Sequence, residues 1–558
     1  MASLMEVMVK KPNTSNFDLS KNISMSANTG PLYPVYQHYC VPGEFVSINY
    51  DALIRTNPAF APLYGRYKVK IDTFFCPYRL YNPSYRLNDD DFDVYGTLHP
   101  LIRLPQVGTG QSTLTVNFQT PSVYPGSVLN YLGLPPFYFD RSAAGNYCEF
   151  NAYAYAAYVD IYRNYYVDPQ RTYGVVMGVT RGDIDNNFRR PYVINYPMDS
   201  LNDVVRSFSE AQPGSPAVLD FNESFMAGYD AGLFLRTYQP DIFTANLNPI
   251  ALSELYTTNG VRVSDNVFTW QQARMSSKLT RLAELTQVFG GRFSDWLSGV
   301  FGITSKKNLD IPQYLGSSTM YFSFSEETVS ATTSQATTGA PVGKGFSSSN
   351  SFRPIKFKAT EYGVLMTILS ICPIPHYIQG VNPFLLKKKA SDDYNPILDN
   401  IGFQDLPLAY LYASYNGDYT KRAPGASPIT LNVWTGVSGQ FADPFKVVLG
   451  SVPAWTEYCT AWDTAYGCVA SVHDRIYWTL ARQFSPSVAP ANLTASSYGL
   501  RSLPAFNSMN DFDSYVRPNY WQYPFSVQDT NAQNWFVRLS LSVKATLPKS
   551  KNVMPTLN

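Results

Sequence analysis

The hydrophobic pattern of the chain is clearest near its C-terminal end. From Trp535 to Leu547 every second residue is apolar, and the positions between them are polar from Arg538 onward. An alternation with a period of two is typical of a β-strand that buries one face and leaves the other in water. We therefore predict a long antiparallel strand over residues 535–547.

The same alternation runs from Tyr67 to Phe75, where Lys68, Lys70 and Asp72 occupy the second face. It predicts a strand that is wet on that second face and ends at Pro77, because proline has no N–H with which to continue a ladder. Further strands are predicted at residues 114–118, 355–359, 364–372 and 429–433.

Two longer segments have helical spacing instead. Apolar residues from Ala154 to Tyr165 fall on one helical face, and the segment ends before Pro169. A second helix is predicted from Met275 to Phe289, where two glycines follow, and a short third at residues 293–300.

Strands at both ends of the chain, separated by long intervals, favour a mainly β fold. We predict an eight-stranded antiparallel jelly roll with long loop insertions and a few helices. No repeat or linker divides the chain, so we expect an N-terminal arm at residues 1–30 and a single domain at 31–558. Within that domain, residues 171–235 predict a surface insertion, and the Ser/Thr/Gly-rich residues 328–351 predict a flexible loop.

The composition is rich in rings and poor in charge. Aromatic residues make up 15% of the chain, including 42 tyrosines, and charged residues also make up 15%, against about 25% in an average globular protein. Tyrosine is common at protein–protein interfaces, because it buries a large ring and keeps a polar tip. The composition thus favours a protein that contacts other protein chains over a tyrosine-rich β-protein without partners.

The formal net charge is only +1, from 43 Lys+Arg and 42 Asp+Glu. This balance argues against a dedicated nucleic-acid binder, which would carry a strong basic bias. It is compatible with a shell that encloses DNA, provided that positive charge is confined to the inner face or supplied by a separate basic protein. The six cysteines form no CxxC pair, which predicts reduced, mostly buried thiols in a protein made in the cytoplasm.

Short blocks of sequence recur in a fixed order along most of the chain and resemble those of one viral family. They are NFDLS at 16–20, VPGE at 41–44, FFCPYRL at 74–80, SVLNYLGLP at 127–135, AYVDI at 157–161, DIFT at 241–244, GGRF at 290–293, FG at 301–302, PQYLG at 312–316, EYG at 361–363 and WTLAR at 478–482. The set resembles the major capsid protein of the microviruses, small icosahedral phages with circular single-stranded DNA. The gokushovirus-like branch is the most similar, with Cys76 where valine is usual.

The resemblance implies a structural protein that assembles into a small T=1-like icosahedral shell of sixty copies. The shell would package circular single-stranded DNA, present the surface that meets the host, and be assembled in the bacterial cytoplasm before it becomes the virion capsid. The partners implied are other copies of the chain, the DNA, scaffolding and pilot proteins, a small basic DNA-binding protein and a receptor on the host cell.

The residues themselves give no sign of an enzyme. The four histidines are isolated in sequence, and none has the spacing of a metal or catalytic motif. We therefore predict no catalytic residue, no metal site and no cofactor. The acidic run at residues 89–93 lacks the glycine and the glutamate of a calcium loop, and reads as a solvated turn, with a weak cation shared between subunits as the alternative.

Basic residues cluster at few places, and such clusters are usually solvated. Lys10 and Lys11 are the preferred DNA contact, because they lie on the predicted N-terminal arm and would neutralise phosphates without reading sequence. The cluster at residues 387–389 reads as a solvated face.

Two other functions remain open on residue chemistry alone. One is a tyrosine-rich carbohydrate-binding β-sandwich, and the other is a glycoside hydrolase with paired carboxylates such as Glu457 and Asp463. Neither accounts for the ordered blocks of sequence.

Overall fold

The computed structural model describes part of the chain at residue level. The described residues are 14–82, 85, 98–105, 123–136, 147–166, 175–179, 192–196, 218–220, 233–234, 311–328, 341–349, 354–398, 402–410, 413, 448–470, 478–481, 485–486, 505–506, 521, 524–527, 533–549 and 551. Lys10, Lys11, the acidic run 89–93, the predicted helices at 275–300 and the predicted strands at 114–118 and 429–433 lie outside them.

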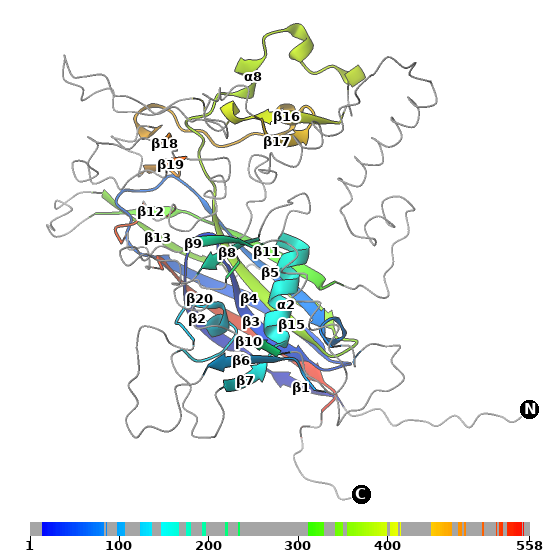
Figure 1. The fold of residues 1–558 in the computed structure, drawn as a ribbon. Coiled ribbons are helices and arrows are strands. Elements are labelled where there is room, and N and C mark those ends of the chain that lie inside the picture. Colours follow the sequence, from blue (N-terminus) through cyan, green and yellow to red (C-terminus); the bar gives the residue numbers. More distant parts are fainter. Residues whose placement is uncertain are drawn as a thin grey trace, which may run out of the picture.

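Two antiparallel sheets face each other across the core (Figure 1). The larger, seven-stranded sheet has the order β1-β20-β4-β13-β12, with β2 also paired to β20 and β14 to β4. Its strands are β1 (Ser15–Asp18), β2 (Lys21–Ala27), β4 (Phe45–Thr56), β12 (Phe324–Thr328), β13 (Pro341–Ser349), β14 (Ile355–Lys358) and β20 (Trp535–Leu547). The smaller sheet has the order β11-β5-β15-β3. Its strands are β3 (Leu32–Cys40), β5 (Tyr67–Pro77), β11 (Gln313–Phe322) and β15 (Gly363–Pro373).

The connectivity of these strands is that of a jelly roll. In chain order β2, β4, β13 and β20 lie in the larger sheet, whereas β3, β5, β11 and β15 lie in the smaller one. Each sheet thus takes strands from distant parts of the sequence, which is how eight strands wind into two packed Greek keys. The predicted fold class is confirmed, and the short N-terminal strand β1 extends the larger sheet.

The C-terminal strand is where the alternation predicted it, at β20 (Trp535–Leu547). It pairs with β4 from Trp535↔Thr56 to Thr546↔Phe45, and with β1 and β2 on its other side. The segment expected as an arm at residues 1–30 therefore contains two strands of the sheet from Ser15 onward. Those strands form because β20 offers them an edge that would otherwise expose unpaired N–H and C=O groups.

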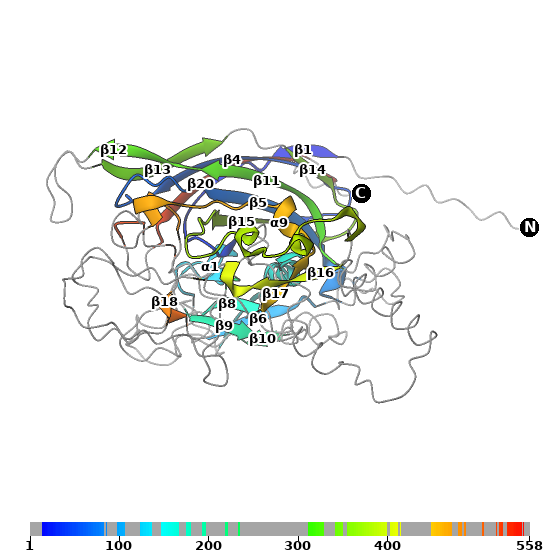
Figure 2. The ribbon, with the colours of Figure 1, turned by 90° about the horizontal axis from the view of Figure 1, so that it is seen from above.

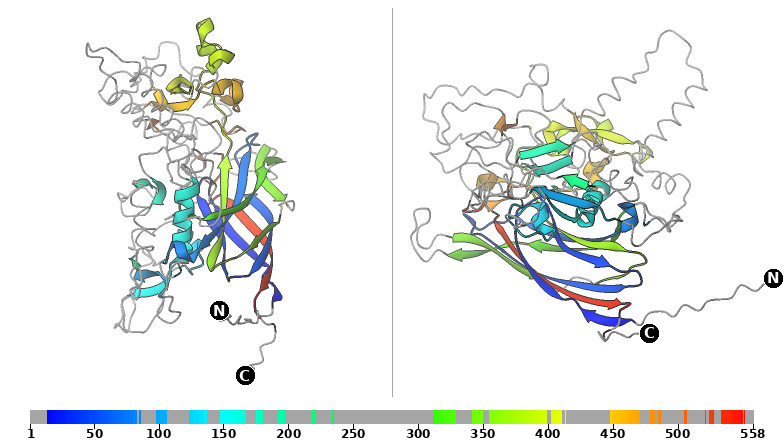
Figure 3. Two further views of the ribbon diagram at one scale, coloured as in Figure 1. Left: turned by 90° about the vertical axis from the view of Figure 1, so that its right-hand side faces the viewer. Right: turned by 60° about the horizontal axis from the view of Figure 1, so that its bottom comes forward.

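The prediction that β5 is wet on one face holds for Lys68 and Lys70, which are partly exposed, but fails from Asp72 onward. Asp72 and Phe74, on the outer face, are each only 1% exposed. The helix α2 (Tyr153–Ile161), which continues as a π-helical turn at Tyr162–Tyr166, lies against the smaller sheet (Figure 3). The Tyr166 hydroxyl donates to Asp72 Oδ2 at 2.9 Å, and Lys70 Nζ lies 3.0 Å from Asp72 Oδ1. The carboxylate is thus buried with both a donor and a cation.

Buried tyrosines account for much of the aromatic composition. On α2, the Tyr158 hydroxyl donates to the Leu32 carbonyl at 2.8 Å and accepts from Phe234 N–H at 2.9 Å. The ring of Tyr153 stacks on Tyr78 with centroids 3.9 Å apart. In this part of the chain the rings therefore fill the core while their hydroxyls bind backbone groups, so composition by itself overstates the amount of interface.

One tyrosine hydroxyl joins the two sheets through the middle of the core. Tyr50, on β4, lies 2.7 Å from Thr73 Oγ1 of β5 and 2.8 Å from Thr367 Oγ1 of β15. Burial raises the pKa of Tyr50 to about 12, so its hydroxyl keeps its proton and can donate at neutral pH.

Residues 328–351 were expected to be a flexible loop, but residues 341–349 form β13. This strand pairs with β4 through Phe346↔Arg55 to Ser349↔Ala52, and with β12 on its other side. Gly345 is required there, because a Cβ would lie 2.4 Å from the Phe322 ring. The small residues that suggested a loop allow a strand to pass close to a ring.

Smaller elements surround the sandwich. They are η1 (Tyr78–Leu80), β6 (Leu101–Pro105), α1 (Val128–Tyr131), β7 (Tyr147–Asn151), β8 (Val175–Val179), β9 (Tyr192–Tyr196), β10 (Val218–Asp220), α8 (Pro383–Leu386), η6 (Ala390–Asp392), η7 (Pro396–Leu398), β16 (Phe403–Pro407), η8 (Leu408–Tyr410), β17 (Val448–Pro453), α9 (Thr456–Cys459), η9 (Gly467–Ala470), β18 (Ser485–Pro486) and β19 (Ala505–Phe506). In the predicted insertion 171–235, β8 pairs with β9, and Leu233 and Phe234 are fully buried in the core. The described helices include none long and apolar enough to cross a bilayer.

Replacing Tyr50 with phenylalanine should destabilise the fold. The Tyr50→Phe variant keeps the ring but leaves the two threonine hydroxyls without their shared partner, at a cost of about 1–2 kcal/mol in the free energy of unfolding. Urea denaturation followed by tyrosine and tryptophan fluorescence measures this loss. The control is Tyr321→Phe, whose side chain is exposed and should change nothing. Equal stabilities for the two variants would contradict the bridge.

Candidate functional site

The outer face of the larger sheet is the first candidate site, because no described element covers it (Figure 2). Along β4 and β20 buried and exposed residues alternate strictly enough to separate a core face from a solvent face. The solvent face carries Phe45, Asn49, Asp51 and Arg55 from β4 and Phe536, Arg538, Ser542 and Lys544 from β20.

Basic residues outnumber acidic ones on this face, which we call the open sheet face. Its described cations are Arg55, Lys356, Lys358, Arg538 and Lys544, and its described anions are Asp18 and Asp51. The strand register brings them side by side: Lys544 lies opposite Ser47 of β4, which in turn lies opposite Lys356 of β14. Positive charge is thus concentrated here in a chain whose net charge is only +1.

Two exposed rings lie among these charges. Phe45 is opposite both Thr546 and Lys358, and Phe536 is opposite Arg55. Phe45 and Phe536 are 41% and 47% exposed, whereas their neighbours along each strand on the core face are buried. A surface of cations and exposed rings suits an unpaired polynucleotide, whose phosphates are anionic and whose bases all present a π-face.

The predicted DNA contacts Lys10 and Lys11 lie outside the described residues, but they precede β1 of this same sheet. The open sheet face itself was not predicted from the sequence. The polar positions of β20, such as Arg538 and Lys544, indicated one strand of this face. The sequence of a single strand cannot show which charged residues the neighbouring strands place beside it.

The second candidate site is a knob at the end of the molecule far from β1 (Figure 1). It consists of residues 383–398, which contain α8, and residues 455–459, which contain α9. At its centre Lys387 Nζ lies 3.0 Å from Glu457 Oε1 and 2.9 Å from the Tyr458 hydroxyl. Lys387 Nζ also faces the rings of Tyr458, Phe384 and Trp455, at 4.1, 5.3 and 5.6 Å from their centroids.

Two predictions from the sequence, one on Lys387 and one on Glu457 with Asp463, differ from what the structure shows at the knob. Lys387 was expected on a solvated face, but only 13% of its side chain is exposed, because the rings and Glu457 surround it. The carboxylates of Glu457 and Asp463 were weighed as a hydrolase pair. Each instead has its own cation, since Asp463 lies 3.6 Å from Arg66, and this arrangement gives no support to a shared catalytic role.

Hydrogen bonds lower the pKa of Glu457, the carboxylic acid at the centre of the knob. Burial alone would raise the pKa of the Glu457 carboxyl, but hydrogen bonds from Gln404 and Lys387 outweigh burial and hold the pKa below its ordinary value of 4.5. The Gln404 amide donates to Glu457 Oε2 at 2.7 Å. Glu457 is therefore an anion at neutral pH, and it anchors α9 to α8 through Lys387.

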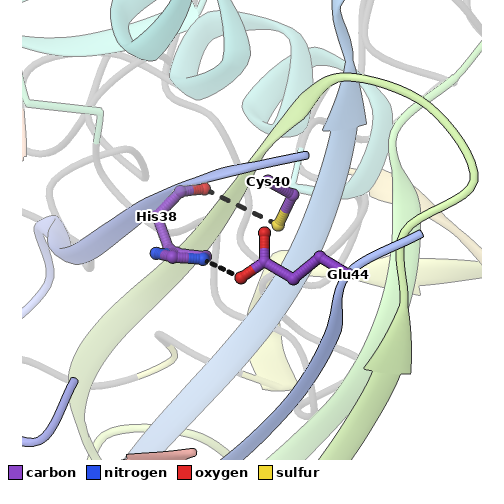
Figure 4. Close-up of side chains that lie close together, drawn as sticks. All are labelled: His38, Cys40 and Glu44. Carbon is purple, nitrogen blue, oxygen red and sulfur yellow. Dashed lines mark hydrogen bonds and ion pairs between the residues drawn. The ribbon is translucent and has the colours of Figure 1, made fainter. Parts of the chain in front are cut away.

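The third candidate site joins three potential metal ligands near the turn between β3 and β4 (Figure 4). His38, Cys40 and Glu44 bring their ligand atoms within 4.8 Å of one another. His38 Nε2 lies 2.7 Å from Glu44 Oε1, and Glu44 Oε2 accepts the Val41 N–H at 2.9 Å. His38 was predicted to be isolated, because its spacing to Glu44 in the sequence matches no known metal-binding motif. The turn between β3 and β4 nevertheless brings Glu44 back to it.

These groups fit a hydrogen-bonded pair of His38 and Glu44 that closes the turn better than they fit a metal site. Burial, with the nearby Glu44 charge, raises the pKa of the Cys40 thiol far above its ordinary value, so the thiol keeps its proton and is a poor ligand. The Glu44 carboxylate is fully buried and has both oxygens engaged. The remaining described histidines are His99, 3.2 Å from the Tyr153 hydroxyl, and His376, whose buried Nδ1 has no hydrogen-bond partner among the described residues.

Comparison with known proteins supports the family resemblance. Residues 6–190 match the model of the phage family described as "Capsid protein (F protein)". The match covers about a third of the chain; it confirms the resemblance to the microvirus major capsid proteins and supports a structural capsid protein. No match was found among curated proteins.

The Glu44→Gln substitution should destabilise the folded chain by about 1–3 kcal/mol. It keeps the size of the side chain but replaces the buried carboxylate that binds His38 and the Val41 N–H with a neutral amide. The matched control is Glu361→Gln, which disrupts the more exposed pair with Arg79 and should cost less than about 1 kcal/mol. Urea denaturation compares the two. A rise in melting temperature with added Zn²⁺ that disappears in Cys40→Ala would instead identify a metal site.

Acid should weaken the knob. Because the folded pKa of Glu457 lies below its ordinary value of 4.5, its charge stabilises the fold above that pH, and the contribution is lost as the pH falls through the folded pKa. The melting temperature of Glu457→Gln should therefore lie below that of the unmodified chain at pH 6, and the gap should narrow below pH 4.5. A gap that stays constant from pH 6 to pH 3 would contradict this assignment.

Proposed function

We propose that the protein forms a closed icosahedral shell of sixty copies around circular single-stranded DNA, with the open sheet face turned toward the DNA. The observation that carries the proposal is the asymmetry between the two sheets. The smaller sheet is covered on its outer face by α2, whereas no described element covers the basic and ring-bearing outer face of the larger sheet.

Charge and the course of the chain support this orientation. A phage that packages DNA needs cations near the phosphates, and the open sheet face concentrates them without making the whole chain basic. The strands that border it also lead into further lysines. Lys10 and Lys11 precede β1, and Lys549 and Lys551 follow β20, so terminal segments would extend the same cationic surface.

The mode of DNA binding that this face favours is independent of sequence. Lysine and arginine side chains would neutralise phosphates, while Phe45 and Phe536 would stack on unpaired bases. The capsid protein would then hold the packaged strand by many weak contacts repeated in every copy. A small basic protein could supply the charge that the modest excess of cations does not.

The opposite side of each copy would face outward. We propose that the insertion at 171–235, apart from its end at Leu233 and Phe234, which is buried in the core, contributes to the outer surface that meets a host receptor. Scaffolding and pilot proteins would act during assembly in the bacterial cytoplasm.

The test uses the chain produced in bacteria, where electron microscopy should reveal small hollow or DNA-filled spheres. A variant with Lys356, Lys358, Arg538 and Lys544 changed to Gln should still fold, since all four side chains are exposed. Its binding to an oligo(dT) strand should weaken, and the slope of log K against log salt should fall by about 2–3, since each neutralised phosphate contributes about 0.7.

The control replaces Lys388 and Lys389, which are equally exposed but lie on the knob, with Gln. This control should leave the salt slope nearly unchanged. A single monomeric species that never forms particles, even when the scaffolding proteins are produced with it, would contradict the shell. Equal loss of DNA affinity in both variants would contradict the assignment of the open sheet face.

A further inference from the structure

The knob carries the most exposed aliphatic side chains among the described residues. Leu385 is 77% exposed and Ile397 is 87% exposed. The rings of Phe384, Tyr394 and Tyr458 lie in the same knob and are each more than 40% exposed. Burying such a leucine or isoleucine would contribute about 1.5–3 kcal/mol, so several such side chains exposed on two short segments mark a surface that another molecule covers.

The knob is held in a fixed shape before any contact is made. The ion pair of Lys387 with Glu457 joins its two segments, and the Asp392 carboxylate accepts the N–H groups of Lys388 and Lys389, each at 3.0 Å. Trp455 has a backbone φ of 63°, and among the described residues no other non-glycine residue has a positive φ. A bulky residue in this conformation is strained and is retained where the surrounding structure needs that geometry. A preformed surface binds with a smaller loss of conformational entropy.

The chemistry of the knob favours a protein partner over DNA or sugar. The most exposed side chains, Leu385 and Ile397, are aliphatic and offer neither hydrogen bonds nor a π-face, and the rings of the knob are each less than half exposed. The cation nearest the rings, Lys387, is already neutralised by Glu457. Aliphatic and aromatic side chains with a polar rim are instead the usual composition of a contact between proteins.

The charges at the rim point to a second copy of the same chain. Two cations, Lys388 and Lys389, are followed within four residues by two anions, Asp392 and Asp393. A rim with equal numbers of both signs is neutral as a whole, so two copies do not repel each other there. In a two-fold contact each patch meets its own counterpart, and the cations of one copy can face the anions of the other.

We infer that the knob is a contact between copies of this chain, in which Leu385 and Ile397 are buried against a neighbouring subunit across a two-fold axis. This inference rests on the proposed function, because it presumes that copies assemble. The position of the knob is suitable, since it projects from the end of the sandwich opposite β1 (Figure 1).

The experiment introduces a charge at Leu385 or at Ile397, the two most exposed aliphatic side chains of the knob, and measures assembly. Leu385→Asp and Ile397→Asp are produced beside Leu385→Met and Ile397→Val, which keep the apolar surface. The aspartate variants should reduce the yield of particles at least tenfold, while the conservative variants assemble normally. Particle yield is measured by sedimentation and electron microscopy, and folding by circular dichroism and the melting temperature of the unassembled subunit.

The controls separate this inference from the proposed function. If the unmodified chain forms no particles, the proposed function fails and the inference fails with it. If the unmodified chain and both aspartate variants assemble equally well, the inference alone is overturned. Aspartate variants that assemble normally but lose attachment to host cells would place a host molecule on the knob and would also overturn it. Leu385→Ser and Ile397→Ser supply the same test should an aspartate variant melt early.

Discussion

The antiparallel ladder between β20 and β4 is the interaction on which the rest of the structure depends. It joins residues 535–546 to residues 45–56 without interruption, and β20 then carries β1 and β2 on its other edge. Backbone groups buried in a sheet need hydrogen-bond partners, and only a strand from the far end of the chain supplies them here. The ladder therefore closes the jelly roll, fixes which side chains of β4 enter the core, and creates the open sheet face on the other side.

Both sheets of the sandwich are antiparallel, but they have different surroundings. That difference makes the two sides of the molecule chemically distinct. On the smaller sheet, α2 and its tyrosines cover β15 and β5, so that even Asp72 is buried and bonded. On the larger sheet the alternation of β20 stays visible as a wet face. A subunit with one covered and one uncovered sheet is suited to a shell wall, since the wall must present different chemistry to its contents and to its surroundings.

Tyrosine serves two purposes in this protein. Inside, the rings fill volume, and hydroxyls such as those of Tyr50 and Tyr158 bond across the core. Outside, rings such as those of Phe384 and Tyr458 form a fixed knob around Lys387. Its high aromatic content thus follows in large part from a core filled with rings. The family match over residues 6–190 covers the N-terminal strands and α2, whereas the knob lies beyond it.

The sequence alone determined the strands whose alternation is strict, such as β20 and β5, because side chains on one strand report directly which face is apolar. It also determined α2 and the kind of fold, since ordered blocks of residues and terminal strands are properties of the chain itself. The tertiary structure decided what lies against each face. It buried Asp72 under Tyr166, turned the small residues of 341–349 into a strand beside β4, and enclosed Lys387 among rings. It also brought Glu44 back to His38. Burial and charge pairing arise between residues far apart or across a turn, so the physical environment of these side chains exists only once the chain has folded.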